Sequence, residues 1–259
     1  MTEDQTPAPI ETDDVVAERA PEPAPGGSHQ VGRALIARGL TLRSIRGTVF
    51  GPVDVDLPPG VPGAVLGTQG SGRSALLLAL VGRLQGAGGE LTLGDMDGIR
   101  HPHRLRRATT VARITDYVEL EPLLTIRECI DEHCLAEGIS RRTGRERFAR
   151  LEAAVGFHPD HGDQVSSLPA EDRTILTCML ACLRPADVIV YDDIDSSLTR
   201  PQLEHVYRVL ETLGRLGHRF VVSALTSTPV PRGAVVVEMP TPGHDDLPAA
   251  LPTRPSLED

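Results

Sequence analysis

Apolar and polar residues alternate in the first part of the chain. The alternation over Val53, Val55 and Leu57 has the period of a strand that buries one face. A similar run, ALIARGLTLRS, occupies 34–44. A Pro-Pro-Gly turn at 58–60 follows the run that ends at Leu57. The pattern therefore predicts two strands, over 34–44 and 47–57.

From residue 63 onward, short apolar runs alternate with helical patterns. GAVL (63–66) predicts a buried strand, and SALLLALVGRLQ (74–85) has helical spacing up to the stop signal GAGG. ELTLGD (90–95) is another strand candidate, the charged stretch 117–163 is expected to be helical, and TILTCMLACL (174–183) predicts an apolar helix.

The last third of the folded part repeats this alternation. ADVIVYDD (186–193) is an apolar run that ends in two carboxylates, as buried parallel strands do. An amphipathic helix is predicted over 201–217, and strands over 218–225 and 234–239. Strands and helices in this order predict an α/β fold around a mostly parallel sheet flanked by helices.

Charge and proline are concentrated at the two ends. The net charge is −10, and residues 1–31 form an acidic, Pro-rich segment that we expect to be disordered. A second disordered tail is expected over 240–259, which leaves 32–239 as the folded domain. No basic block suggests nucleic-acid binding. The longest apolar run, 75–81, is far too short to span a bilayer, so any membrane role is expected to be peripheral.

Two groups of residues have spacings that metal sites also use. Cys178 and Cys182 are one helical turn apart, and we expect them to be small apolar residues on a buried helix face, as reduced thiols in a cytosolic protein. Four of the nine histidines fall in two pairs, at 101 and 103 and at 158 and 161. No Cys or carboxylate cluster accompanies either pair, so we expect solvated loop residues.

The stretch GTQGSGRS has the glycine spacing of a phosphate-binding loop between a predicted strand and a predicted helix. Glycines let backbone N–H groups approach phosphate closely, and the helix N-terminus favours negative charge. The alternative is an ordinary Gly-rich turn. The candidate nucleotide-binding residues are Gly67, Thr68, Gln69, Gly70, Ser71, Gly72, Arg73, Ser74 and Ala75.

Arg73 occupies the position at which this loop usually has lysine. The sequence contains no lysine at all, so the substitution is partly a matter of composition. Arginine keeps the positive charge, but its planar guanidinium does not match a compact ammonium. We therefore expect phosphate binding that is retained and weakened.

A magnesium site and a base complete the expected chemistry. Ser74 places a hydroxyl where Mg²⁺ sits in such loops, and Asp192 ends an apolar strand, where phosphate-loop proteins hold the same ion. Asp193 stands where a general base for water is expected, and it is our candidate catalytic residue. The alternative is a strand that ends in solvated carboxylates.

These motifs together resemble the nucleotide-binding subunits of ATP-binding cassette (ABC) transporters, over nearly all of 35–238. LGTQGSGRSALLLALVGRL is similar to the family's Walker A segment, and LEPLLTIRECI to the stretch after its Q-loop. Leu168 lies 24 residues before Asp192, as the family's signature leucine does before its Walker B aspartate. The resemblance implies a P-loop NTPase fold with an N-terminal antiparallel β part and a small helical subdomain at about 115–165.

Several family positions carry other residues here. The signature LSGGQ is LPAED (168–172), the D-loop aspartate is Thr199, and the switch histidine is Leu225. The Q-loop glutamine falls near Asp116. Near the adenine-stacking position, Phe50 is the candidate, although a core role is favoured for it.

The resemblance implies ATP and Mg²⁺ as ligands, a membrane permease as partner, and a homodimer or a heterodimer with another ATP-binding subunit. The protein is then expected in the cytoplasm, peripheral on the inner face of the cell membrane. One hypothesis is the energy-coupling ATPase subunit of a transporter, in the first instance an exporter, with weak or absent hydrolysis. The other is a non-hydrolysing, nucleotide-responsive regulatory or scaffolding subunit of a membrane complex. A soluble P-loop kinase does not fit the signature spacing.

Overall fold

The computed structural model describes residues 32–45 and 47–240. The predicted disordered tail 1–31 lies outside these residues, and so does the predicted tail 240–259 apart from its first residue. Within the described part, two β-sheets and six α-helices alternate along the chain. The helices are α1 Arg73–Leu80, α2 Pro102–Ala108, α3 Ile126–Ala136, α4 Arg141–Val155, α5 Ala170–Ala181 and α6 Arg200–Arg215.

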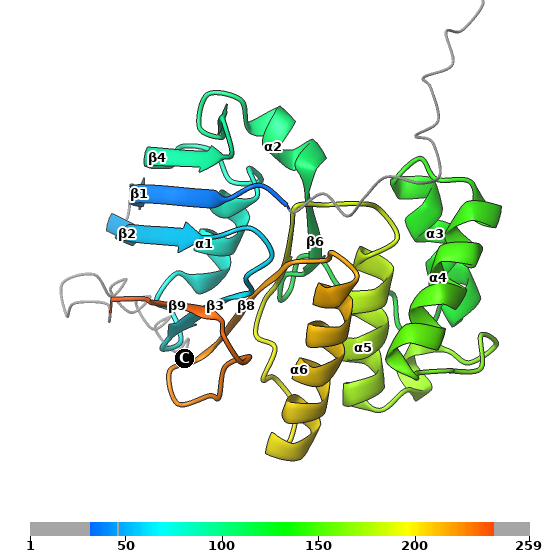
Figure 1. The fold of residues 1–259 in the computed structure, drawn as a ribbon. Helices are drawn as coiled ribbons and strands as arrows, with labels where there is room; N and C mark the ends of the chain where they lie inside the picture. Colours follow the sequence, from blue (N-terminus) through cyan, green and yellow to red (C-terminus); the bar gives the residue numbers. More distant parts are fainter. Residues whose placement is uncertain (1–31, 46, 241–259) are drawn as a thin grey trace, which may run out of the picture. The chain divides into compact units, whose positions relative to one another are not determined.

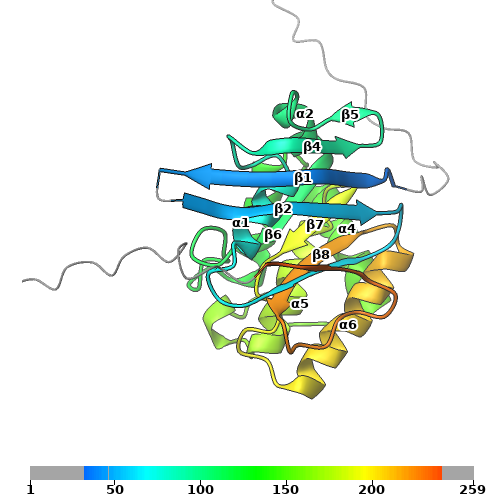
Figure 2. The same cartoon turned by 90° about the vertical axis from the view of Figure 1, so that its left-hand side faces the viewer.

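The first sheet is antiparallel and has the order β2-β1-β4-β5. Leu35 of β1 lies opposite Leu57 of β2 on one side and Leu93 of β4 on the other, so these leucines share one buried face. The long β1 and β2 run side by side across this sheet (Figure 2). Its strands are β1 Leu35–Ser44, β2 Gly47–Leu57, β4 Gly88–Leu93 and β5 Met96–Asp97.

The second sheet is parallel and has the order β6-β7-β8-β3-β9. Neighbours in this sheet are far apart in the sequence, because each crossover contains a helix or a longer segment. The carboxyl ends of β3, β7 and β8 therefore lie at one edge of the sheet. The strands are β3 Gly63–Gly67, β6 Thr109–Arg113, β7 Val188–Tyr191, β8 Phe220–Leu225 and β9 Val235–Glu238.

The parallel sheet separates two hydrophobic cores. Val188 and Val190 of β7 pack with α1 and the antiparallel sheet, whereas Ile189 and Tyr191 face α5 and α6. This alternation follows from the two-residue period of a strand. Figure 1 shows the same layers: α1 lies between the sheets, and α5 and α6 cover the opposite side of the parallel sheet, with α3 and α4 beyond them.

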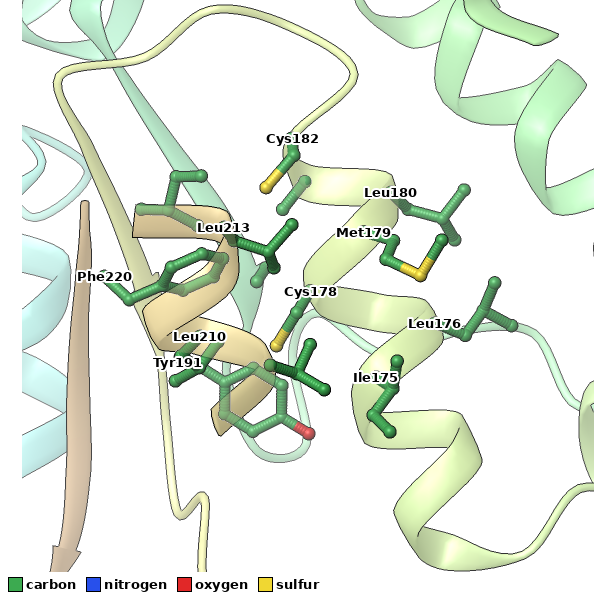
Figure 3. Close-up of a cluster of buried hydrophobic side chains, with 14 of the residues drawn as sticks. Ile175, Leu176, Cys178, Met179, Leu180, Cys182, Tyr191, Leu210, Leu213 and Phe220 are labelled. Carbon is green, nitrogen blue, oxygen red and sulfur yellow. The ribbon is translucent and has the colours of Figure 1, made fainter. Parts of the chain in front are cut away.

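The apolar helix α5 fills the second core. Cys178 and Cys182 are buried there beside Leu213 and Phe220, as Figure 3 shows. Burial raises the pKa values of both thiols well above the ordinary range, which keeps them protonated. The prediction that these cysteines act as small apolar residues is confirmed.

Most of the predicted strands and helices are present, with two corrections. The helix expected over 74–85 ends at Leu80, because Gly82 adopts a positive φ and the Arg83 N–H bonds back to the Leu78 carbonyl. The stretch expected to be helical over 117–163 contains α3 and α4 with loops before, between and after them. The sequence prediction missed α2 and β6, which lie in a polar, Arg-rich stretch.

Side chains define where the later helices begin. Thr125 caps α3 in a reciprocal capping box with Glu128, and Thr199 does the same for α6 with Gln202. Thr199 thus has a structural task at the position where the family's D-loop has aspartate. None of the helices in the described ranges is long and apolar enough to cross a membrane.

Candidate functional site

The loop between β3 and α1 has the shape that its glycines predict. Gly70 and Gly72 adopt φ angles of 79° and 88°, the left-handed region that side chains rarely enter. A Cβ at Gly72 would collide with the carbonyl oxygen of Val49, so this glycine also lets β2 approach the loop. The first N–H groups of α1 have no intrahelical acceptor and are available to an anion.

This loop forms one wall of a cavity of about 450 Å³, which we call the loop cavity. Its lining consists of the loop from Gln69 to Ala75, the Ser44 and Gly47–Val49 region where β1 meets β2, and Asp193 after β7. The predicted residues Gly67 and Thr68 are not part of the lining. The structure thus brings most of the predicted loop residues together with Asp193, the second carboxylate after β7.

Arg73 points toward this carboxylate. Its Nη2 lies 2.7 Å from Oδ1 of Asp193, and its side chain is only 9% exposed. Nη1 of Arg73 is buried without an acceptor among the described residues. The arginine at the lysine position is therefore an inward-facing cation that Asp193 partly neutralises.

Asp192 is fully buried beside the loop. Its Oδ1 accepts a hydrogen bond from the Ser223 hydroxyl, whose oxygen in turn accepts the Asp193 backbone N–H at 2.8 Å. Its Oδ2 has no partner in the described part of the chain, and neither has the buried hydroxyl of Ser71. A buried carboxylate oxygen without a donor costs free energy. A divalent cation would satisfy this oxygen, so Asp192 fits the predicted Mg²⁺ site, and Ser74, the other predicted ligand, lines the loop cavity.

Asp193 is held from several sides. It adopts a φ of 48°, and its Oδ2 accepts a hydrogen bond from Thr115 at 3.4 Å. Burial raises the pKa of its carboxyl group, the neighbouring charge of Asp192 raises it further, and Arg73 opposes both effects. Arg113 donates to the backbone carbonyl of Asp192 at 3.3 Å. The group predicted to be a general base for water is thus bound to the loop arginine.

The signature-like segment LPAED sits at the start of α5. Leu168 is buried, and Pro169 precedes the helix without contributing an N–H. Glu171 lies in the first turn, where its charge stabilises the helix dipole, and its Oε1 is 2.5 Å from Nδ1 of His205 on α6. This helix N-terminus therefore carries a carboxylate of its own, which disfavours an approaching phosphate.

The backbone at the switch position is held by Asp195, four residues before the D-loop position Thr199. The Leu225 backbone N–H donates to Oδ2 of Asp195 at 3.0 Å, and the Leu225 side chain is 45% exposed. Leucine has no group that could hold a γ-phosphate. The Q-loop position, Asp116, is exposed and adopts a φ of 65°.

Phe50 and His161 make contacts that differ from those of a ligand site. Phe50 is 2% exposed and packs in the core between the sheets, which confirms its core role. His161 lies 2.7 Å from Glu152 and packs edge-on against Phe148, so it is not simply solvated as predicted. No cluster of His, Cys, Asp and Glu suited to a metal occurs within residues 32–45 and 47–240.

Three residues at this site escaped the sequence prediction: Arg113, Thr115 and Ser223. Ser223 lies near the carboxyl end of β8, the strand next to β7, and the rule that parallel strands gather polar groups at this edge would have found it. Arg113 is the last residue of β6 and Thr115 follows this strand, which the apolar pattern did not reveal.

The glycine loop before α1, the parallel sheet and the buried aspartate at the end of β7 define a P-loop nucleotide-binding fold. The model of the ABC transporter family matches residues 50–196, more than half of the chain. The chain belongs to the ABC transporter family, among its nucleotide-binding subunits.

The curated relatives agree with this assignment. The ribose import ATP-binding protein RbsA 1 of Rubrobacter xylanophilus is 30% identical, over 70% of this chain and 37% of its own length. The D-allose import ATP-binding protein AlsA of Escherichia coli is 26% identical, over 68% of this chain and 37% of its own length. The chain therefore spans only about a third of the length of these relatives.

Solved structures share the fold. The dimeric structure of the bacterial ABC transporter cassette MJ0796 superposes with a TM-score of 0.64, at 16% identity, over 79% of this chain and 94% of that one. The ADP conformation of the cassette MJ1267 superposes with a TM-score of 0.63, at 16% identity, over 74% of this chain and 81% of that one. At this identity the likeness concerns the fold alone.

Proposed function

We propose that this chain is the ATP-binding subunit of an ABC-type membrane transporter, which binds Mg²⁺-ATP at residues 67–74 and couples to a separate permease. The observation that carries the proposal is the unpartnered, buried Oδ2 of Asp192 beside a glycine loop with an inward-facing Arg73. The bound Mg²⁺ would supply charge neutralisation between Asp192, Ser74 and phosphate. The proposal places the protein in the cytoplasm, peripheral on the inner face of the membrane.

The relatives favour import over export. The curated relatives cited above are import ATP-binding proteins whose names specify ribose and D-allose. Their similarity to this chain supports an importer of monosaccharide type.

Intrinsic hydrolysis is proposed to be weak or absent. Asp193 is bound to Arg73, Glu171 occupies the signature helix, and Leu225 stands at the switch position. Groups that orient water, γ-phosphate and metal act as a unit, so their combined replacement lowers turnover strongly. A dimer with a better-equipped ATP-binding subunit would still hydrolyse ATP at one of its two sites, and a homodimer would not.

The same three residues support the second candidate, a non-hydrolysing, nucleotide-responsive regulatory or scaffolding subunit. The two candidates differ in one measurement, ATP turnover by the purified protein. The double variant Arg73→Lys and Asp193→Glu restores the usual loop lysine and the longer second carboxylate. A clear gain in turnover supports the transporter motor, and background turnover with intact binding supports the regulatory subunit.

Nucleotide binding itself is tested by calorimetric titration of Mg²⁺-ATP against the wild type, Arg73→Ala and Ser74→Ala. Both substitutions are expected to weaken binding at least about tenfold, because each removes a charge-assisted contact to phosphate or metal. Arg208→Ala, an exposed position on α6, serves as the control. Undiminished binding in both loop variants would remove the basis of the site.

A further inference from the structure

Arg73 and Asp193 form an ion pair in the wall of the loop cavity. The two side chains are 9% and 30% exposed, and Nη2 lies 2.7 Å from Oδ1. Salt screens a pair in this partly buried position less than it screens a surface pair. The arginine that is expected to meet phosphate therefore already has an anion as its partner.

The pair leaves part of the arginine unsatisfied. A guanidinium has five N–H donors, and Nη1 of Arg73 is buried without an acceptor among the described residues. Phosphate oxygens accept forked hydrogen bonds from arginine, as carboxylate oxygens do. A nucleotide phosphate thus offers Arg73 the same kind of bond that Asp193 offers, and it offers more acceptors.

Asp193 is fixed independently of Arg73. Its backbone N–H donates to Ser223 at 2.8 Å, and its Oδ2 accepts from Thr115 at 3.4 Å. Arg73, in contrast, extends on a long side chain from the first turn of α1. When an anion enters the loop cavity, Arg73 is therefore the partner that moves.

We propose that Asp193 is a positioning residue that holds Arg73 away from phosphate, so that nucleotide binding requires Arg73 to exchange one anion for another. This inference rests on the proposed nucleotide-binding function. It assigns Asp193 the role of positioning Arg73, in place of the expected role of general base for water. The exchange lowers the affinity for nucleotide, because the ion pair must break before Arg73 can bind phosphate. The contact between Arg73 and Asp193 is then present only while no nucleotide is bound.

The test is a double-mutant cycle on nucleotide binding with Asp193→Asn and Arg73→Met. Asparagine matches the shape of aspartate and tolerates the φ of 48° at this position. Methionine keeps an unbranched side chain without the charge. ADP is the probe, titrated calorimetrically with Mg²⁺ and again with a chelator, because ADP is not hydrolysed and the chelator removes the contribution of metal at Asp192. Glu146→Gln, on the exposed side of α4, makes the same change in net charge far from the loop in sequence.

Asp193→Asn is expected to tighten ADP binding about tenfold, a tenfold change being within the coupling range of contacting charged residues. In the Arg73→Met background the same substitution is expected to change the affinity less than about twofold. Glu146→Gln is expected to leave it unchanged. A merely structural role for Asp193 would weaken binding instead.

Three outcomes would overturn the inference while ADP still binds. They are equal tightening in both backgrounds, which indicates simple repulsion between Asp193 and phosphate, no change, or weaker binding. Absence of ADP and ATP binding in every variant, the wild type included, would overturn the proposed function together with the inference.

Thermal unfolding without nucleotide provides a second readout of the pair. Arg73→Met and Asp193→Asn are each expected to lower the melting temperature, and the double variant is expected to melt close to the less stable single variant. Additive effects would show that the two side chains do not interact in the ligand-free protein and would overturn the inference.

Discussion

The guanidinium of Arg73 lies 2.7 Å from the carboxylate of Asp193, although 120 positions separate the two residues in the sequence. The parallel sheet makes this contact, because the carboxyl ends of β3 and β7 lie at the same edge. The contact joins the glycine loop to the carboxylates after β7, the two motifs that a nucleotide site needs. Its member in the loop, Arg73, occupies the position at which such loops usually have lysine.

Gly72→Ala is expected to abolish the loop geometry. The residue has a φ of 88°, and a Cβ there would collide with the Val49 carbonyl. We expect nucleotide affinity to fall more than tenfold and stability to fall by about 1–3 kcal/mol. The measurements are ADP titration and denaturant unfolding.

Gly214→Ala is the matched control for that substitution. Gly214 lies inside α6, and an added Cβ has no atom within 4 Å. Alanine should stabilise this helix by about 0.5–1 kcal/mol and leave ADP binding unchanged. A Gly72→Ala variant that binds ADP normally would show that the loop does not cradle phosphate.

Ser223→Ala is expected to disturb both carboxylates. The Ser223 hydroxyl donates to Asp192 and accepts the Asp193 backbone N–H. Its loss leaves buried polar groups without partners, which costs about 1–3 kcal/mol of stability.

We also expect Ser223→Ala to show a smaller ratio between the ADP affinities measured with and without Mg²⁺, because Asp192 is no longer oriented. Ser167→Ala, which removes a hydroxyl contact near the surface, should change neither quantity. An unaltered Mg²⁺ ratio in Ser223→Ala would argue against Asp192 as a metal ligand.

Arg219→Ala is expected to be strongly destabilising. The guanidinium is buried and donates to four backbone carbonyls in three separate segments, those of Arg33, of Leu57 and Pro58, and of Asp187. Removing it leaves several acceptors unsatisfied, at a cost of about 3 kcal/mol or more. The melting temperature should fall by roughly 6–12 °C.

Arg219→Lys should recover only part of this stability, because a single ammonium cannot reproduce the spread of a guanidinium. Calorimetric unfolding of both variants checks the ranking. Equal stability of Arg219→Ala and the wild type would mean that water replaces these bonds without cost.

The folded protein is expected to lose stability in mild acid because of His218. Burial lowers the pKa of this imidazole from 6.5 to about 4, so the folded state binds fewer protons than the unfolded chain between these values. Its contribution is complete above about pH 6.5 and is lost as the pH falls to about 4. The loss amounts to at most about 3 kcal/mol.

Unfolding of the wild type and of His218→Gln between pH 7.5 and 4.5 measures most of this effect. The variant should show a flatter dependence of stability on pH. His103→Gln, at an exposed position, should retain the dependence of the wild type. Identical slopes in all three proteins would exclude His218 as the source of the acid sensitivity.

The local pattern of the sequence was sufficient for much of the fold. Alternation over Val53, Val55 and Leu57 identified a strand that buries one face, and the apolar run before Asp192 identified β7. The glycine spacing predicted a tight loop between a strand and a helix, and Gly70 and Gly72 adopt left-handed backbone in that loop. These features follow from steric limits and side-chain periodicity, which act over a few residues and are therefore visible in the sequence.

Other features depend on residues that meet only in the folded chain. The apolar pattern missed β6, and with it Arg113 and Thr115, because its threonines and arginine find their partners in distant segments. The residue type of Asp193 suggested a base, whereas its position beside Arg73 makes it the partner of a cation.

By itself, the sequence determined the order of most strands and helices, the glycine loop between β3 and α1, and the family. Only the tertiary structure decided which charges neutralise each other at the edge of the parallel sheet. The physical reason is that an electrostatic interaction depends on distance and burial, and both are set for Arg73 and Asp193 by the packing of β3 beside β8 and of β8 beside β7.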